Sequence, residues 1–148
     1  RRVVEYVHDE AEKNLPIMEG VHEILQYFHE HGVRMATASS STVMQIEMNL
    51  RKSGLRKYFD AVVGGDLVTR GKPAPDIFLL AAEHIGILPA DCYVFEDGYN
   101  GLRGAATAGC APVMIPDTMP PTDEMRDLCV GIYPSLVAAM DAIQQGAL

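Results

Sequence analysis

The sequence predicts an α/β fold in which a parallel, Rossmann-like sheet carries helices on both faces. Short apolar runs, at residues 33–39, 92–96 and 111–115, alternate along the chain with longer segments of helical periodicity. Several of the longer segments end at a glycine, which is typical of a helix C-terminus. Strands and helices that alternate at this spacing are joined by right-handed crossovers and therefore form a parallel sheet.

Composition limits the classes of partner. The 148 residues are 48% hydrophobic and 22% charged, which is typical of one globular domain, and the formal net charge is −8. Nucleic acid and anionic membrane surfaces both require an extended basic face, so neither is expected as a partner. No apolar run approaches the roughly 18 residues of a membrane span, and no signal peptide is apparent.

The cysteines indicate a reducing compartment. Cys92, Cys110 and Cys129 are odd in number and widely spaced. We expect buried, reduced thiols in a cytoplasmic protein. A nucleophilic cysteine is the alternative interpretation.

The first part of the chain is predicted to form two helices and a strand. Residues 3–13 place apolar side chains at helical spacing among charged ones, which predicts an amphipathic helix, and residues 14–16 form a linker that ends in proline. Residues 20–31 predict a second helix with Gly32 as its cap. Residues 33–39 then predict a buried strand.

The middle of the chain continues the alternation. Thr42 is predicted to cap a helix that Gly54 ends, and residues 58–65 hold a second short strand. The prolines of residues 70–76 hold the backbone extended before a helix over residues 76–85.

The last part of the chain contains the most apolar strand. Residues 92–96 predict a strand buried on both faces, and residues 99–109 a helix rich in small side chains. Residues 111–115 predict another strand, and residues 131–133 a short edge strand. Ser135 is predicted to cap a final helix.

Three features place polar groups just beyond predicted strands, where open α/β sheets bind ligands. Glu96 and Asp97 offer the hard oxygen ligands that suit Mg²⁺. Ser39 and Ser40 offer hydroxyl and N–H groups that suit a phosphate oxygen, and Lys72 offers an ammonium. Each feature also has an alternative interpretation without a ligand. The carboxylates could be loop residues, one of which caps a helix, the serines could cap a helix, and Lys72 could be a solvated surface lysine.

Three runs of residues carry a family resemblance. Residues 36–40 (ATASS), 71–78 (GKPAPDIF) and 95–106 (FEDGYNGLRGAA) resemble the second, third and fourth motifs of the haloacid dehalogenase-like (HAD) superfamily. More narrowly, the sequence is similar to the β-phosphoglucomutase and phosphatase-like branch, in which a cap domain is inserted before the second motif. The resemblance extends from about Pro16 to the C-terminus.

The resemblance implies a function and a role for each polar residue. It implies a Mg²⁺-dependent phosphatase or phosphomutase that acts on a small phosphorylated metabolite through an aspartyl-phosphate. Ser39 and the N–H of Ser40 would bind the transferring phosphoryl group, and Lys72 would neutralise it. Asp97 would ligate Mg²⁺ directly, and Glu96 directly or through water. Phosphoryl transfer is accelerated mainly by such positioning and charge cancellation.

One motif of the family is absent. Its first motif is an aspartate nucleophile followed two residues later by a second aspartate, and no Asp-x-Asp occurs in this chain. Asp9 and Asp117 do not follow a predicted strand, so neither is expected to replace the nucleophile. The chain alone is therefore predicted to be inactive, because no aspartyl-phosphate forms without the aspartate.

The missing motif also affects the predicted fold. In the family it supplies the central strand, so we expect a sheet that lacks this strand and has two unpaired edges through which the chain could dimerise. Residues 1–16 would be a remnant of a cap helix and its hinge, and residues 17–148 the core. The first residue is not methionine, which suggests part of a longer protein.

Three other functional classes have weaker support in the sequence. A noncatalytic α/β interaction or regulatory module, a pseudoenzyme, is the main alternative, although the joint presence of Ser39, Lys72 and Asp97 argues against it. A receiver-like domain would need a phosphoacceptor strand early in the chain. A dinucleotide site at residues 98–104 has the spacing G-x-x-G-x-x-G, which differs from the usual fingerprint.

Overall fold

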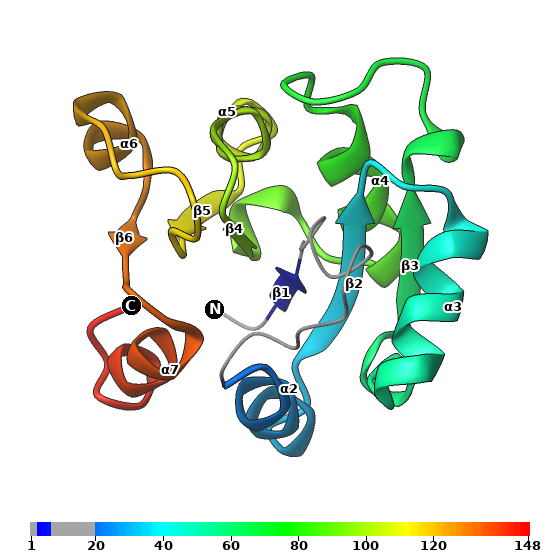
Figure 1. Ribbon diagram of the computed structural model, residues 1–148, viewed down its shortest axis with the longest axis horizontal. Coiled ribbons are helices and arrows are strands. Elements are labelled where there is room, and N and C mark those ends of the chain that lie inside the picture. Colours follow the sequence, from blue (N-terminus) through cyan, green and yellow to red (C-terminus); the bar gives the residue numbers. More distant parts are fainter. Residues whose placement is uncertain (1–2, 7–19) are drawn as a thin grey trace.

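A computed structural model describes residues 20–148 and the backbone of residues 3–6. It confirms the α/β fold: six parallel strands form one sheet in the order β3-β2-β1-β4-β5-β6 (Figure 1). The strands are β1 (Val3–Tyr6), β2 (Arg34–Ser39), β3 (Ala61–Gly64), β4 (Cys92–Glu96), β5 (Ala111–Met114) and β6 (Gly131–Ile132).

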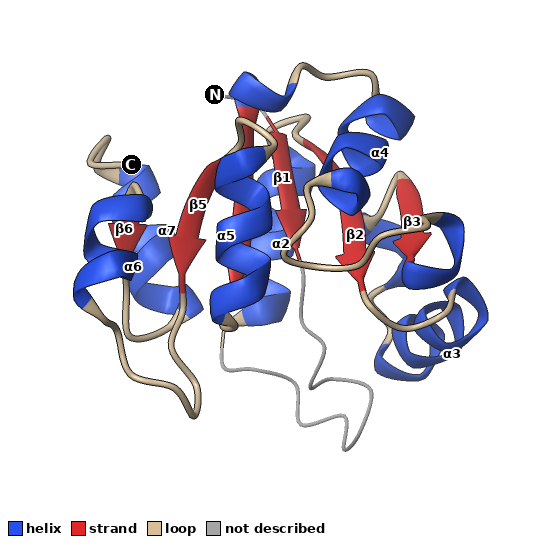
Figure 2. Ribbon diagram, turned by 90° about the horizontal axis from the view of Figure 1, so that it is seen from above, coloured by secondary structure: helices blue, strands red, loops and turns tan. Residues whose placement is uncertain are grey.

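Helices lie on both faces of this sheet (Figure 2). They are α2 (Val21–Glu30), α3 (Val43–Ser53), α4 (Asp76–Ile85), α5 (Tyr99–Thr107), α6 (Asp123–Leu128) and α7 (Leu136–Gln144). Helices α2 and α7 cover one face, whereas α4, α5 and α6 cover the other, and α3 packs beside β3 (Figure 1). Three 3₁₀ turns connect elements: η1 (Arg56–Tyr58), η2 (Gly65–Leu67) and η3 (Pro89–Asp91).

Strand β4 is buried on both faces, as its apolar run predicts. Tyr93 and Phe95 point into the cluster under α2 and α7, where the ring centroids of Phe95 and Phe28 are 6.2 Å apart. Cys92 and Val94 point into the cluster under α4 and α5. Because side chains alternate along a strand, Glu96 belongs to the second face, the one that α5 covers.

Two parts of the prediction for the N-terminus are wrong. The first residues of the predicted helix over 3–13 instead form strand β1, which pairs with both β2 and β4 and so fills the position expected to be empty. A gap there would leave two rows of buried backbone N–H and C=O groups without partners, which costs free energy. The β-branched and aromatic residues of Val3–Tyr6 also favour a strand.

This pairing alters other expectations. The two unpaired edges that suggested a dimer are paired by β1, so that reason for expecting one is removed. Asp117 lies three residues beyond β5, and Asp9 three residues beyond β1, so the statement that neither follows a strand is also wrong. Asp9 itself and the hinge at 14–16 lie outside the described residues, and the division of the chain at residue 16 stays a prediction.

Most helix ends are confirmed. Thr42 Oγ1 accepts a hydrogen bond from Gln45 N at 3.2 Å, and Ser135 Oγ accepts one from Ala138 N at 3.1 Å. Gly54 and Gly86 end α3 and α4 in the left-handed region. Helix α6 was not predicted, because it is only one to two turns long and directly follows a proline-rich loop.

The cysteines mostly agree with the prediction. None of the three is in a disulfide; Cys92 and Cys110 are buried, whereas Cys129 is only partly so. Within the described part of the chain, no helix is long and apolar enough to cross a membrane.

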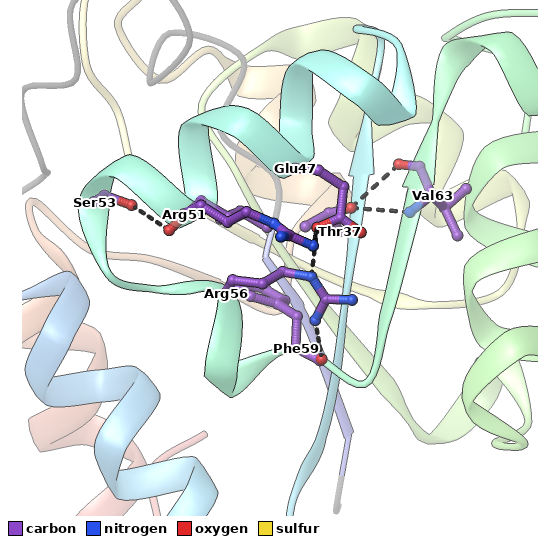
Figure 3. Close-up of polar contacts among 8 residues, drawn as sticks. Thr37, Glu47, Arg51, Ser53, Arg56, Phe59 and Val63 are labelled. Carbon is purple, nitrogen blue, oxygen red and sulfur yellow. Dashed lines mark hydrogen bonds and ion pairs between the residues drawn. The ribbon is translucent and has the colours of Figure 1, made fainter.

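Polar contacts fasten α3 and β3 beside β2 (Figure 3). Arg56 donates to Glu47 Oε1 of α3 at 2.6 Å and to the Phe59 carbonyl at 2.8 Å. Thr37 Oγ1 of β2 accepts from Val63 N at 3.0 Å and donates to Val63 O at 3.3 Å. The Thr37–Val63 bonds hold β3 against β2 close to the point where the loop at residues 39–42 begins.

Acidification is expected to remove the contribution of the Glu47–Arg56 pair to stability. The hydrogen bond from Arg56 holds the pKa of Glu47 below its ordinary value. A carboxyl with a lowered folded-state pKa stabilises the fold above its unfolded pKa of about 4.3, and this is lost as pH falls through the folded-state pKa. Glu47→Gln should therefore lower the free energy of unfolding by roughly 0.5–1 kcal/mol at neutral pH and leave it unchanged at strongly acidic pH.

Urea unfolding of the two proteins at both pH values measures this difference. Glu83→Gln, at an exposed residue of α4, is the matched control and should have little effect at either pH. A Glu47→Gln penalty that persists at strongly acidic pH would contradict the assigned ion pair.

Candidate active site

The predicted polar residues meet at the carboxyl edge of the sheet. Ser39 ends β2, Glu96 ends β4 with Asp97 directly after it, and Lys72 lies in the loop between η2 and α4. Parallel strands end at one edge, which is why residues far apart in sequence meet there. A pocket of about 520 Å³ lies at this edge and is lined by Ser40, Lys72, Glu96, Asp97, Gly98, Tyr99, Asn100, Gly101, Arg103, Thr118 and Met119.

A buried ion pair forms the floor of the pocket. Lys72 Nζ donates to Glu96 Oε2 at 3.1 Å, and the two side chains are only 7% and 2% exposed. Glu96 Oε1 accepts from the backbone N–H groups of Asp97 and Gly98 at 2.9 and 3.2 Å. Since both carboxylate oxygens have donors, the charge of Glu96 is compensated despite its burial.

Two glycines of α5 allow this floor to form. A Cβ at Gly101 would overlap the carboxylate of Glu96, and a Cβ at Gly104 would come within 2.9 Å of the Ala74 carbonyl oxygen. Helix α5 therefore lies directly against both Glu96 and the loop that carries Lys72. The ammonium of Lys72 also lies 5.5 Å from the centroid of the Phe78 ring, which adds a cation–π contact.

The serine loop, residues 39–42, is held by hydrogen bonds to η2, the turn that directly follows β3. Ser39 is buried, and its Oγ accepts from Ser41 N at 3.2 Å. The N–H of Gly65 donates to the Ser41 carbonyl at 2.7 Å, and Asp66 Oδ1 accepts from Val43 N at 3.1 Å. Sequence reasoning missed this support, although a glycine and an aspartate, Gly65 and Asp66, directly follow β3.

Gly65→Ala is expected to displace the serine loop and destabilise the fold. Its Cβ would overlap the Ser40 carbonyl oxygen, a backbone atom that cannot simply rotate away. We expect a loss of about 1–3 kcal/mol in the free energy of unfolding, measured by urea unfolding. Gly71→Ala is the matched control, because nothing lies within 4 Å of a Cβ there. Equal effects at the two positions would contradict the close approach.

The far wall of the pocket is held by one ion pair and by hydrogen bonds that the sequence did not reveal. Arg103 of α5 donates to the two carboxylate oxygens of Glu124 at 2.8 and 2.7 Å and to Asn100 Oδ1 at 3.0 Å. The Arg103 guanidinium holds the pKa of Glu124 below its ordinary value. Tyr99 donates to the Pro120 carbonyl at 2.6 Å. These contacts fasten the loop between β5 and α6, which brings Thr118 and Met119 to the pocket.

The structure thus brings Lys72, Glu96, Asp97 and Ser40 to one pocket, with Ser39 adjoining Ser40 at the end of β2. Their roles in chemistry stay predictions. Among the described residues no three His, Cys, Asp or Glu side chains gather as a ready metal cluster. One or two carboxylates nevertheless suit Mg²⁺, which keeps several waters and takes further ligands from phosphate. The donor set therefore fits the ion that the resemblance implies.

Comparison with known proteins decides the family. Residues 2–109 match the family model described as haloacid dehalogenase-like hydrolase. The chain belongs to the haloacid dehalogenase-like hydrolases. The resemblance drawn from its three motifs is therefore confirmed.

Several haloacid dehalogenase-like relatives are named phosphatases. The chain is 49% identical over 80 residues to fructose-1-phosphate phosphatase of Escherichia coli, covering 53% of this chain and 43% of that protein. It is 39% identical over 90 residues to the phosphorylated carbohydrates phosphatase of Thermotoga maritima, covering 61% and 42%. It is 39% identical over 111 residues to a probable pseudouridine-5'-phosphatase of Drosophila melanogaster, covering 71% and 48%.

Solved haloacid dehalogenase-like structures agree with the fold. A putative β-phosphoglucomutase from Thermotoga maritima superposes with a TM-score of 0.78 at 28% identity, covering 86% of this chain and 59% of that one. This chain therefore spans less than half of the three phosphatases above and under two thirds of the solved structure.

Proposed function

We propose that the protein to which this chain belongs is a Mg²⁺-dependent phosphatase or phosphomutase that acts on a small phosphorylated metabolite. The observation that carries the proposal is the buried Lys72–Glu96 pair beside Asp97, in a polar pocket at the carboxyl edge of a parallel sheet. The ammonium suits an anionic phosphate group, and the carboxylates suit the metal cation that accompanies it. The names of the relatives support the same class.

Each residue has a proposed task. While it keeps its bond to Glu96, the Lys72 ammonium would also donate to the phosphoryl group and neutralise charge on its oxygens, and the Ser39 hydroxyl and the Ser40 N–H would fix the position of that group. Asp97 would hold Mg²⁺ directly. Glu96 would act through water, because both its oxygens already accept hydrogen bonds from Lys72 and from backbone N–H groups. When bound, Mg²⁺ would supply positive charge to the phosphoryl oxygens.

The covalent step through an aspartyl-phosphate needs an aspartate nucleophile. Because the sequence contains no Asp-x-Asp, we propose that these 148 residues alone are inactive. Incubation of the chain with p-nitrophenyl phosphate and Mg²⁺ should give no more product than a buffer blank. Turnover that Asp97→Asn abolishes would overturn this proposal and show that another residue supplies the nucleophile. Asp9→Asn would be the first variant to test in that case, since Asp9 follows β1 in the sequence.

Activity of a longer protein that includes this chain tests the function itself. With a panel of phosphorylated sugars and nucleotides, Asp97→Asn and Lys72→Met should each lower kcat/KM by roughly 100-fold or more. Asp141→Asn, at an exposed residue of α7, is the control and should leave kcat/KM unchanged. Turnover of these substrates that neither variant lowers would refute the proposed site.

The alternative is a noncatalytic α/β regulatory module on the same scaffold. It predicts no phosphate release by the longer protein on any member of the panel. We also propose a cytoplasmic location, without nucleic-acid or membrane partners. The three cysteines, none of them in a disulfide, and the net charge of −8 support this part.

A further inference from the structure

Two cysteines lie opposite one another on neighbouring strands, at the end of the sheet away from the pocket. Tyr93 of β4 is paired with Ala111 of β5, so the same register one residue earlier places Cys110 opposite Cys92. Neighbouring strands are about 4.8 Å apart, and disulfides join Cα atoms separated by roughly 4.4–6.8 Å. The backbone spacing therefore permits a bond between the two sulfurs.

The two side chains also share surroundings. Both belong to the apolar cluster that α4 and α5 cover. A hydrogen bond between the two thiols lowers the pKa of Cys92, against the opposing effects of burial and of the Asp91 charge. The Cys92 thiol itself donates to the Leu88 carbonyl oxygen at 3.4 Å. The two thiols are thus in contact, and Cys92 loses its proton more easily than its burial alone would allow.

Access to solvent differs between the two. Cys92 is fully buried, whereas Cys110 is 6% exposed. A small oxidant would therefore react first with Cys110, and Cys92 would then react with the oxidised sulfur of Cys110. The third cysteine, Cys129, lies in a separate cluster with Leu102, Met114 and Met125, and burial raises its pKa to about 11.

We propose that Cys92 and Cys110 are a redox-sensitive pair that closes to an intramolecular disulfide when the folded protein meets hydrogen peroxide. The Cys110 thiolate attacks one peroxide oxygen, the O–O bond breaks, and water leaves once the second oxygen is protonated, so that Cys110 becomes a sulfenic acid. The Cys92 thiolate then attacks that sulfur, the S–O bond breaks, and a second water leaves. Both sulfurs are oxidised and the peroxide is reduced.

The disulfide would close a covalent loop that contains Glu96 and Asp97. Residues 93–109 lie between the two cysteines and include the rest of β4, Glu96, Asp97 and helix α5. A disulfide restricts the unfolded state of such a loop and so favours the folded arrangement. Disulfides of this kind in reducing compartments are usually transient and redox-sensing, which is consistent with thiols in the resting protein. The inference does not depend on the proposed phosphatase function.

Peroxide treatment of the folded chain, followed by alkylation in denaturant and mass spectrometry, tests the proposal. After digestion, we expect one thiol to be alkylated and the peptides with Cys92 and Cys110 to be joined until dithiothreitol is added, with a mass about 2 Da below the sum of the two reduced peptides. Cys110→Ser should abolish the mass loss, and Cys129→Ser should retain it. Cys92 and Cys110 both alkylated after peroxide, with oxidation confined to Cys129 or to joined pairs of chains, would overturn the proposal.

Discussion

Lys72→Met is expected to destabilise the fold by about 3–5 kcal/mol, the largest effect of any single change considered for this chain. The substitution keeps most of the apolar stem but removes the ammonium, so the buried carboxylate of Glu96 loses its charged donor at Oε2. Urea unfolding at neutral pH measures the loss. Lys52→Met, at an exposed lysine of α3, is the matched control and should change the free energy of unfolding by less than about 0.5 kcal/mol.

A double substitution separates the lost partner from lost packing. If the penalty comes from the loss of the ammonium beside a buried carboxylate, Lys72→Met with Glu96→Gln should be clearly more stable than Lys72→Met alone, because an amide costs less to bury than a carboxylate. Additive losses would show that the two side chains contribute independently, which would contradict the pairing. The double variant should nevertheless lack function in the longer protein, since it keeps neither charge.

Gly101→Ala is expected to impair two properties at once, stability and metal binding. The new Cβ would overlap three atoms of the Glu96 side chain, which is itself held by Lys72 and by backbone N–H groups and so cannot move without losing them. We expect a loss of about 1–3 kcal/mol in the free energy of unfolding, and Mg²⁺ affinity at least roughly tenfold lower.

A neighbouring glycine provides the control for this substitution. Gly98 lies in the same turn, and its nearest contact for a new Cβ is Glu96 Oε1 at 3.9 Å, an ordinary van der Waals distance. Gly98→Ala should therefore be tolerated where Gly101→Ala is not. Rescue gives a second check: in the Glu96→Ala background, Gly101→Ala should cost much less. A full cost in that background would mean that another contact, not Glu96, requires the glycine.

Local sequence signals predicted the elements that depend on neighbours in the chain. The apolar run of β4, the cap at Thr42 and the glycine at the end of α3 are decided within a few residues, and they were predicted correctly. Strand β1 was not, because valines at positions 3, 4 and 7 fit a helix as well as a strand. Pairing with β2 and β4, more than 25 residues away along the chain, decides the outcome.

The same distinction applies to the site. Ser40, Lys72 and the acidic pair could be predicted because each follows a strand or lies in a stiff loop, and parallel topology brings such positions together. The contacts that hold them could not, because they depend on the distance between separate elements. Gly101 is one example, since only its contact with Glu96 shows why a side chain is excluded. Arg103 is another, since its partner Glu124 lies on a helix that was not predicted.

Calorimetric titration of the chain with Mg²⁺ in the presence of inorganic phosphate measures whether Asp97 and Lys72 serve one metal ion and one phosphate. We expect Asp97→Asn to weaken Mg²⁺ binding at least roughly tenfold, and Lys72→Met to weaken the phosphate-dependent part of it. Asp141→Asn should bind as the unmodified chain does. Equal Mg²⁺ affinity for the unmodified chain and for Asp97→Asn would contradict the claim.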